Sequence, residues 1–179
     1  LMERNKRLEI QVVETGEMIS ARIDLAEVND LYLQTLVSFH EMGAQKVWDP
    51  SRLVFVLDHY APAPTIMSAA NQKQMREFCT AFGVPNLFDV NAGICHQVMV
   101  EAGMVRPGML VVETDSHTTT LGALGAFGTG CGATDMAAIM ATGEMWMRVP
   151  EVIYANYVGE LPACIMGKDL ALLTLGKLG

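Results

Sequence analysis

Two uninterrupted apolar runs constrain the fold of this chain most strongly. Residues 53–57 are five apolar side chains in succession, and residues 109–112 are four. A strand with one wet face alternates between apolar and polar residues, whereas a run without alternation is typical of a strand buried on both faces of a parallel sheet. Helical patterns lie between these runs. The sequence therefore predicts an α/β domain with a layered α/β/α arrangement around a largely parallel sheet.

The expected elements alternate along the chain. Apolar patterning predicts strands at residues 8–13, 18–23, 53–57, 86–90, 109–112 and 152–157, with a turn at 14–17 between the first two. It predicts helices at residues 25–42, 68–82, 96–103, from 134 past 141, and 168–178. Residues 122–132 are rich in glycine. That run fits either close packing of backbone against the sheet or a loop that presents N–H groups to an anion.

The charge balance and the cysteines exclude several classes of protein. The net charge is −8, so no basic surface is expected to neutralise nucleic-acid phosphates. No apolar run approaches the roughly 20 residues that span a bilayer, so we expect no membrane partner. The four cysteines are far apart in sequence, which is typical of reduced thiols in a cytoplasmic protein. They are Cys79, Cys95, Cys131 and Cys164.

Three of the four histidines follow predicted strands. Asp58 and His59 come directly after residues 53–57, Asp115 and His117 follow residues 109–112, and His96 begins a helix after residue 90. Ligands bind at the carboxyl ends of parallel strands, and a neighbouring carboxylate suits an imidazole for proton transfer. A single aspartate after a strand is often only a turn or a helix cap. Three such places in one small domain favour a functional site.

Two further residues have weaker claims to a role in chemistry. Ser116 lies between Asp115 and His117, but it lacks the G-x-S-x-G elbow and is not expected to be a nucleophile. His40 falls in the last turn of a predicted helix and is expected to be structural. The residues alone leave two classes open: a general acid–base enzyme acting on a small anion, and a mononuclear metal hydrolase.

Four blocks of sequence together resemble the aconitase superfamily. They are Leu-Asp-His at 57–59, Gly-Ile-Cys-His-Gln-Val at 93–98, Thr-Asp-Ser-His-Thr at 114–118, and the glycine run with Ala-Thr-Gly at 141–143. The similarity runs from about residue 8 to the end. It is strongest to the large subunits of 3-isopropylmalate dehydratase and homoaconitase. By this resemblance, residues 1–179 are a single α/β domain, the N-terminal portion of a larger catalytic subunit.

The resemblance implies a hydro-lyase that dehydrates and rehydrates a hydroxy di- or tricarboxylate. It also implies site residues, each at a position that matches a family motif. The implied catalytic residues are Asp58, His59, His96, Asp115 and His117. The implied substrate-binding residues are Ser116 and, in a loosely similar segment, Gln34.

The resemblance further implies a 4Fe-4S cluster that acts as a Lewis acid in the complete enzyme. The family's cluster cysteines lie in later segments, so we expect no metal ligand of the cluster within this chain and expect this piece alone to be inactive. A small swivelling domain or subunit is expected to supply a serine base. The alternatives are homoaconitase, aconitase or a 2,3-dimethylmalate-type dehydratase, and, in other classes, a non-catalytic domain or an unrelated metal hydrolase.

Overall fold

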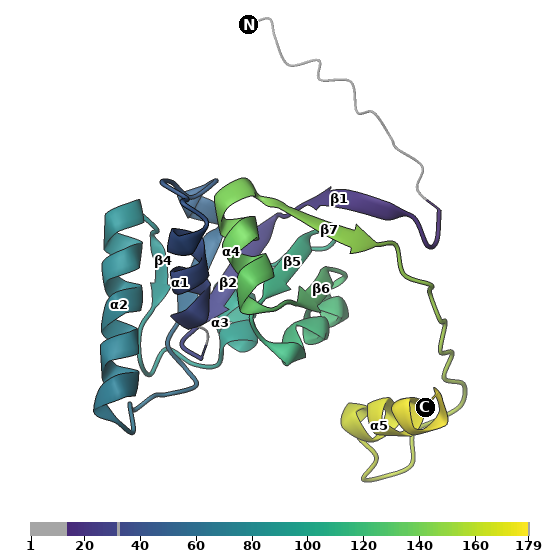
Figure 1. Ribbon diagram of the computed structural model, residues 1–179. Helices are drawn as coiled ribbons and strands as arrows, with labels where there is room; N and C mark the ends of the chain where they lie inside the picture. Colours follow the sequence, from purple (N-terminus) through teal and green to yellow (C-terminus); the bar gives the residue numbers. More distant parts are fainter. Residues whose placement is uncertain (1–13, 32, 179) are drawn as a thin grey trace, which may run out of the picture. The chain divides into compact units, whose positions relative to one another are not determined.

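The computed structural model describes residues 14–31 and 33–178 (Figure 1). Contacts divide the chain into two compact units, of which one is Met18–Met147 and the other combines Leu1–Glu17 with Arg148–Gly179. The strand predicted at residues 8–13 lies outside the described residues. The expectation of a single domain over residues 1–179 stays a prediction.

A five-stranded parallel sheet forms the centre of the larger unit. Its strands, in spatial order, are β4 (Asn86–Phe88), β3 (Leu53–Val56), β2 (Leu25–Asn29), β5 (Leu110–Glu113) and β6 (Phe127–Gly130). Every neighbouring pair is parallel. The predicted fold class is therefore confirmed, and both apolar runs are inner strands of the sheet.

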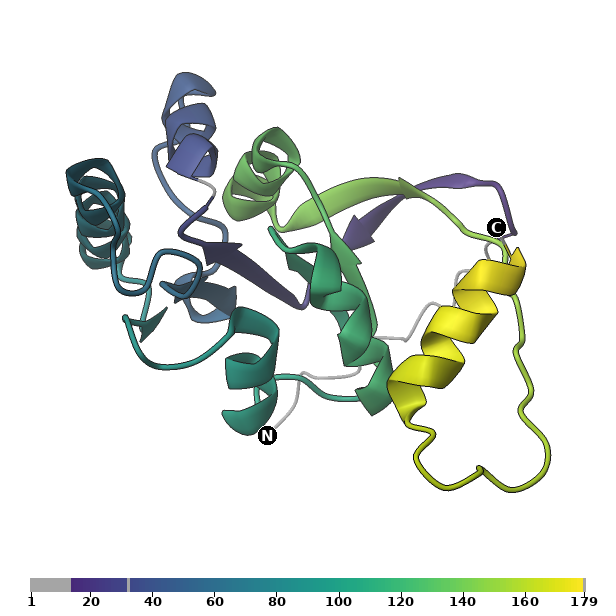
Figure 2. The ribbon, with the colours of Figure 1, turned by 90° about the horizontal axis from the view of Figure 1, so that it is seen from below.

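Helices cover both faces of this sheet, as Figures 1 and 2 show. One face carries α1 (Leu33–Glu41), α2 (Ile66–Phe82) and α4 (Ala133–Thr142), and the other carries α3 (Cys95–Glu101) and the 3₁₀ segment η2 (Ser116–Leu124). In β3, Phe55 packs with Phe78 of α2, whereas Val54 and Val56 pack with Met99 of α3. Side chains on both faces of β3 are thus buried, which explains why its apolar run is uninterrupted.

The remaining elements lie outside this sheet. A short 3₁₀ turn, η1 (Pro50–Arg52), precedes β3. Strands β1 (Met18–Arg22) and β7 (Glu144–Arg148) form a separate two-stranded sheet, and the expected turn before β1 is closed by the Glu17 amide donating to the Glu14 carbonyl at 3.1 Å. In the smaller unit, α5 (Gly167–Leu178) confirms the last predicted helix. Among the described residues, no helix is long and apolar enough to cross a membrane.

Two sequence predictions are wrong. The helix expected over 25–42 begins only at Leu33, because Leu25–Asn29 is strand β2, the middle strand of the sheet. Pairing with β3 on one side and β5 on the other overrides the helix-like spacing of its apolar residues. The strand expected at 152–157 is absent, because these residues are irregular and exposed and have no strand partner.

Two glycines of the glycine run allow close packing. The run contains strand β6, and two of its glycines touch the backbone that leads into and through η2. A Cβ at Gly130 would lie 2.7 Å from the Asp115 carbonyl oxygen, and one at Gly128 would overlap the Thr118 carbonyl oxygen. The missing side chains therefore let β6 lie directly against the segment that carries Asp115.

Two glutamates are buried side by side within the sheet. Glu27 in β2 and Glu113 in β5 are register partners on the face covered by α3 and η2, and both are 0% exposed. In the described part of the chain, none of their four carboxyl oxygens has a hydrogen-bond partner. Burial, followed by the charge of Asp115, raises the pKa of Glu113 to about 8. Burial, followed by the charge of Glu113, raises the pKa of Glu27 well above its ordinary value.

We predict that this pair makes the stability of the metal-free protein fall as pH rises. Folded Glu113 keeps a proton that the unfolded chain releases above its ordinary pKa of 4.5, so stability declines between about pH 4.5 and 8. Each such group contributes a slope of up to about 1.4 kcal/mol per pH unit. Glu113→Gln removes one contribution and is expected to flatten the decline and to raise stability at pH 8. Urea unfolding at several pH values, with a chelator present, measures this.

The control for that series is Glu41→Gln, which neutralises an exposed carboxylate at the end of α1. Its pH profile is expected to match that of the unaltered protein. An unchanged slope in Glu113→Gln would show that the buried pair does not carry the pH dependence.

A second prediction concerns β6. Gly128→Ala is expected to lower the free energy of unfolding by about 1–3 kcal/mol, because the added methyl would overlap the Thr118 carbonyl oxygen and force the backbone to shift. Gly122→Ala is the matched control, since a Cβ at Gly122 meets nothing within 4 Å. Denaturant unfolding of both variants measures the difference. Equal stability of the two variants would contradict the packing role of Gly128.

Candidate active site

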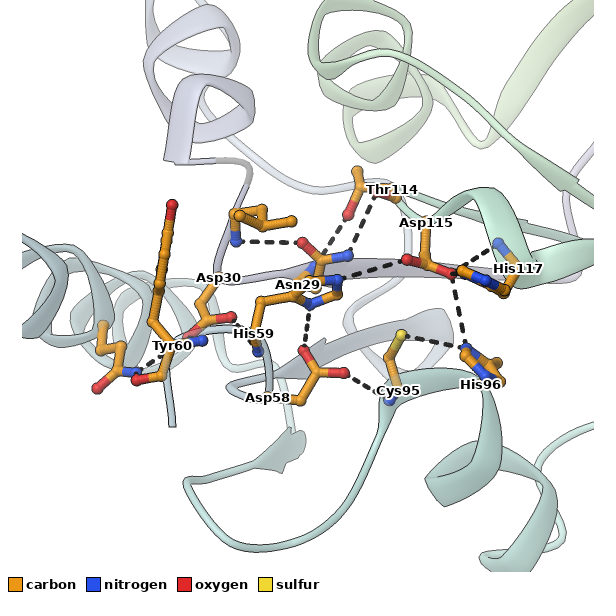
Figure 3. A network of polar contacts seen from close by, with 12 residues as sticks. Asn29, Asp30, Asp58, His59, Tyr60, Cys95, His96, Thr114, Asp115 and His117 are labelled. Atoms are coloured by element: carbon orange, nitrogen blue, oxygen red, sulfur yellow. Dashed lines mark hydrogen bonds and ion pairs between the residues drawn. The ribbon is translucent and has the colours of Figure 1, made fainter. Parts of the chain in front are cut away.

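The polar residues that follow β3 and β5 meet the start of α3 at the carboxyl edge of the sheet (Figure 3). Strands β3 and β5 flank β2, so the segments that leave them lie close together. They form a pocket of about 370 Å³. Its lining residues are Asp58, His59, Ile94, His96, Asp115 and His117. The structure thus brings together all five residues predicted to be catalytic, while their roles stay predictions.

Asp115 is the centre of this arrangement. Its Oδ1 lies 3.2 Å from His117 Nδ1 and 3.6 Å from His96 Nδ1, and its Oδ2 lies 3.5 Å from His59 Nε2. The His117 backbone amide also donates to Asp115 Oδ1 at 2.7 Å. The rings of His96 and His117 stack with centroids 5.6 Å apart. One carboxylate thus lies within 3.6 Å of a ring nitrogen on each of three imidazoles (Figure 3).

Asp58 fixes the third imidazole from its other side. Its Oδ1 lies 2.7 Å from His59 Nδ1, and its Oδ2 accepts a 2.7 Å hydrogen bond from the Cys95 backbone amide. The second contact ties the end of β3 to the first residue of α3. Both ring nitrogens of His59 therefore face carboxylates.

A buried aspartate shapes the backbone around His59. Asp30, which follows β2, is 0% exposed. It accepts hydrogen bonds from the His59 amide at 2.9 Å, the Tyr60 amide at 3.1 Å and Gln72 Nε2 at 2.9 Å. Gln72 also donates to the Tyr60 carbonyl at 2.8 Å. These contacts hold the turn after β3 in place against α2.

Asn29 gives the same kind of support on the other side of the pocket. Its backbone amide donates to Thr114 Oγ1 at 3.0 Å, and its side chain donates to the Thr114 carbonyl at 3.3 Å. These bonds join the end of β2 to the residue before Asp115. Sequence reasoning missed Asn29 and Asp30, because it placed them inside a helix. Had residues 25–29 been assigned as a strand, this polar pair would have stood at its carboxyl end.

Two predicted site residues lie outside the pocket lining. Gln34 is exposed on the first turn of α1. Ser116 begins η2 beside Asp115 and is also exposed. Their substrate contacts stay predictions. His40 lies in the last turn of α1, away from the pocket, where it was expected.

The cysteines do not form a cluster site in the described residues. All four are free thiols, and the groups of side chains that come close enough to share a metal ion contain no more than one cysteine each. An iron–sulfur cluster of this type is held by several thiolates. Burial and the surrounding carboxylates raise the pKa of the Cys95 thiol, so it is neutral unless a metal displaces its proton. The described residues therefore do not bring together the several thiolates that hold such a cluster.

Two groups of donor atoms are suited to a single ion. One consists of Cys95, His96, Glu113 and Asp115, and the other of Asp30, Asp58 and His59. Within each group the ligand atoms lie within 4.8 Å of one another. The first group includes a carboxylate that has no other partner, whereas the oxygens of Asp30 are already bonded.

The chain is similar to proteins named as large subunits of 3-isopropylmalate dehydratase or homoaconitase. The chain is 48% identical over 167 residues to "3-isopropylmalate dehydratase large subunit 1" of Methanopyrus kandleri, which covers 93% of this chain and 40% of that protein. It is 48% identical over 168 residues to the 3-isopropylmalate dehydratase large subunit of Aquifex aeolicus, covering 93% and 39%. It is 46% identical over 175 residues to a Methanothermobacter thermautotrophicus protein named "Probable methanogen homoaconitase large subunit", covering 95% and 41%.

The chain spans about 40% of the length of these relatives. The sequence model of the Aconitase family (aconitate hydratase) matches residues 6–179, which is nearly all of the chain. The matched region contains every residue of the pocket. On this match and these identities, the chain belongs to the aconitase family.

Proposed function

We propose that the protein containing this chain is a hydro-lyase of the 3-isopropylmalate dehydratase type, with residues 1–179 as the N-terminal α/β portion of its catalytic subunit. It removes water from a small hydroxy dicarboxylate and adds water back. The observation that carries the proposal is the pocket in which Asp115 orients three imidazoles. Family membership and the names of the relatives support the same reaction.

The pocket is built to move protons. Asp115 faces Nδ1 of both His96 and His117, which favours the proton on that nitrogen and leaves Nε2 of each ring for the substrate. His59 is held between Asp58 and Asp115, and together with these two carboxylates it would relay a proton toward a departing hydroxyl. Hydroxide is a poor leaving group, so a positioned proton donor lowers the barrier to its departure.

The substrate's negative charge must be met partly from elsewhere. Three histidines line the pocket, and no lysine or arginine does so in the described residues. The proposal therefore places the cationic groups that hold the substrate carboxylates outside this chain. The "large subunit" names of the relatives support a smaller partner subunit as their source, with the predicted serine base.

The proposal also includes a 4Fe-4S cluster, whose cysteine ligands would lie outside residues 1–179. When bound, such a cluster supplies a Lewis-acidic iron for the substrate hydroxyl. Within this chain the pocket residues would face the substrate. The free state of all four cysteines supports the proposed cytoplasmic location.

Homoaconitase is the second candidate within this reaction class, because one relative of similar identity carries that name. The two candidates differ only in the acid that the pocket accepts. Aconitase and 2,3-dimethylmalate dehydratase activities belong in the same substrate panel. Activity measured on this panel of acids therefore identifies the substrate, whereas a variant of a pocket residue tests the role of the pocket in dehydration.

We predict that Asp115→Asn lowers kcat of the complete, iron-loaded enzyme by about 10²–10⁴-fold, because three imidazoles lose the carboxylate that orients them. The measurement is anaerobic turnover of 3-isopropylmalate across a pH range, with the partner subunit present. The pH dependence of kcat is expected to change in the variant, which simple loosening of the fold would not produce.

The matched control is Asp49→Asn, which keeps a helix-capping side chain at η1 and lies outside the pocket. Its kcat is expected to equal that of the unaltered enzyme. Full activity in Asp115→Asn would refute the role given to Asp115. An unaltered enzyme that turns over homoaconitate or citrate, but not 3-isopropylmalate, would refute the substrate assignment. Inactivity on the whole panel would favour a non-catalytic domain.

A further inference from the structure

Glu113 is the buried group that the proposed reaction does not use. It lies at the end of β5, two residues before Asp115, and is 0% exposed. Both its carboxyl oxygens lack a hydrogen-bond partner in the described chain. Its carboxylate comes within 4.8 Å of donor atoms on Cys95, His96 and Asp115. A buried carboxylate without a close hydrogen-bond partner, near three other donor atoms, is suited to bind an ion.

The spacing of these donors matches a coordination site. Cys95 Sγ lies 3.7 Å from His96 Nδ1, and that nitrogen lies 3.6 Å from Asp115 Oδ1. In a tetrahedral zinc site, bond lengths of about 2.0–2.3 Å put neighbouring ligand atoms about 3.3–3.6 Å apart. Two edges of the group are therefore close to tetrahedral spacing, and the Glu113 carboxylate lies within 4.8 Å of the other three donor atoms.

The charge around the group favours a cation. Glu27 and Asp58 add two further carboxyl groups near Glu113 and Asp115. In the part of the chain that the structure describes, the ion pairs of Asp58 and Asp115 are with histidines, and Glu27 and Glu113 have none. A divalent ion would offset this concentration of acidic groups.

We propose that Cys95, His96, Glu113 and Asp115 bind one divalent transition-metal ion of the zinc class. One thiolate, one imidazole and two carboxylates are ligands that zinc accepts. With a single thiolate, this site is distinct from an iron–sulfur cluster site. Binding releases the Cys95 thiol proton. It also occupies His96 Nδ1 and Asp115 Oδ1, the two atoms that otherwise face each other. The loaded site therefore inhibits the proton transfers assigned to the pocket, although binding itself does not depend on that assignment.

Cobalt(II) titration of the full 179-residue chain tests the proposal directly. The unaltered, metal-free chain is expected to bind one Co²⁺ with a thiolate-to-cobalt charge-transfer band and the visible bands of tetrahedral cobalt. Zn²⁺ is expected to displace the cobalt. Cys95→Ser is expected to lose the charge-transfer band. Glu113→Gln is expected to bind about 100-fold more weakly or worse.

Glu27→Gln is the matched control, since it neutralises the register partner of Glu113 but leaves all four donors in place. It is expected to keep both sets of bands. Urea unfolding of the metal-free variants checks that each is folded, and Glu113→Gln is expected to be at least as stable as the unaltered chain. The proposal is overturned if the unaltered chain binds no cobalt, if Cys95→Ser keeps the charge-transfer band, or if Glu113→Gln binds as tightly as Glu27→Gln.

Discussion

The position of Asp115 at the carboxyl edge of a parallel sheet is the constraint on which the site depends. Parallel pairing makes β3 and β5 end on the same side of β2, so the residues that follow them meet there. Asp115 comes from one segment and His59 from the other, and their side chains lie 3.5 Å apart. Segments separated by more than 50 residues thus form one pocket through strand order alone.

The surrounding structure holds that pocket open and fixed. Asp30 and Asn29, both at the end of β2, hydrogen-bond to the segments that follow β3 and β5 respectively. The bare backbones of Gly128 and Gly130 let β6 pack against the segment that carries Asp115. Each imidazole is therefore oriented by a carboxylate whose own backbone is held by neighbouring strands. Contacts of this kind, made to the residues that hold the imidazoles, keep catalytic side chains in one orientation before a substrate arrives.

The same edge concentrates acidic groups in a way that costs stability. Glu27 and Glu113 are neighbours across β2 and β5 and lie wholly inside the protein. Two buried carboxylates without partners cannot both stay ionised, so protons or a metal ion must offset their charge. Ordinary packing would favour apolar residues at both positions. A buried pair of glutamates is therefore expected where a functional site uses their protonation or their charge.

The sequence predicted some parts of this molecule well and others poorly, for physical reasons. Residues 53–57 and 109–112 were recognisable because strands buried on both faces need apolar residues at every position. The histidines could be placed because they directly follow such strands. Strand β2 was missed because Glu27 interrupts its apolar run and leaves a helix-like spacing, and Asn29 and Asp30 were missed with it. The pairing of Glu27 with Glu113 depends on strand order and register, which no local pattern encodes.

The position of the proton on the histidine rings, read by nitrogen-15 NMR on the metal-free chain, tests the role of Asp115 most directly. Neutral His96 and His117 are expected to carry their proton on Nδ1, facing Asp115, and Asp115→Asn is expected to abolish this preference. Rings that carry the proton on Nε2 in the unaltered chain, or that keep the same pattern in Asp115→Asn, would contradict the claim that Asp115 orients the site.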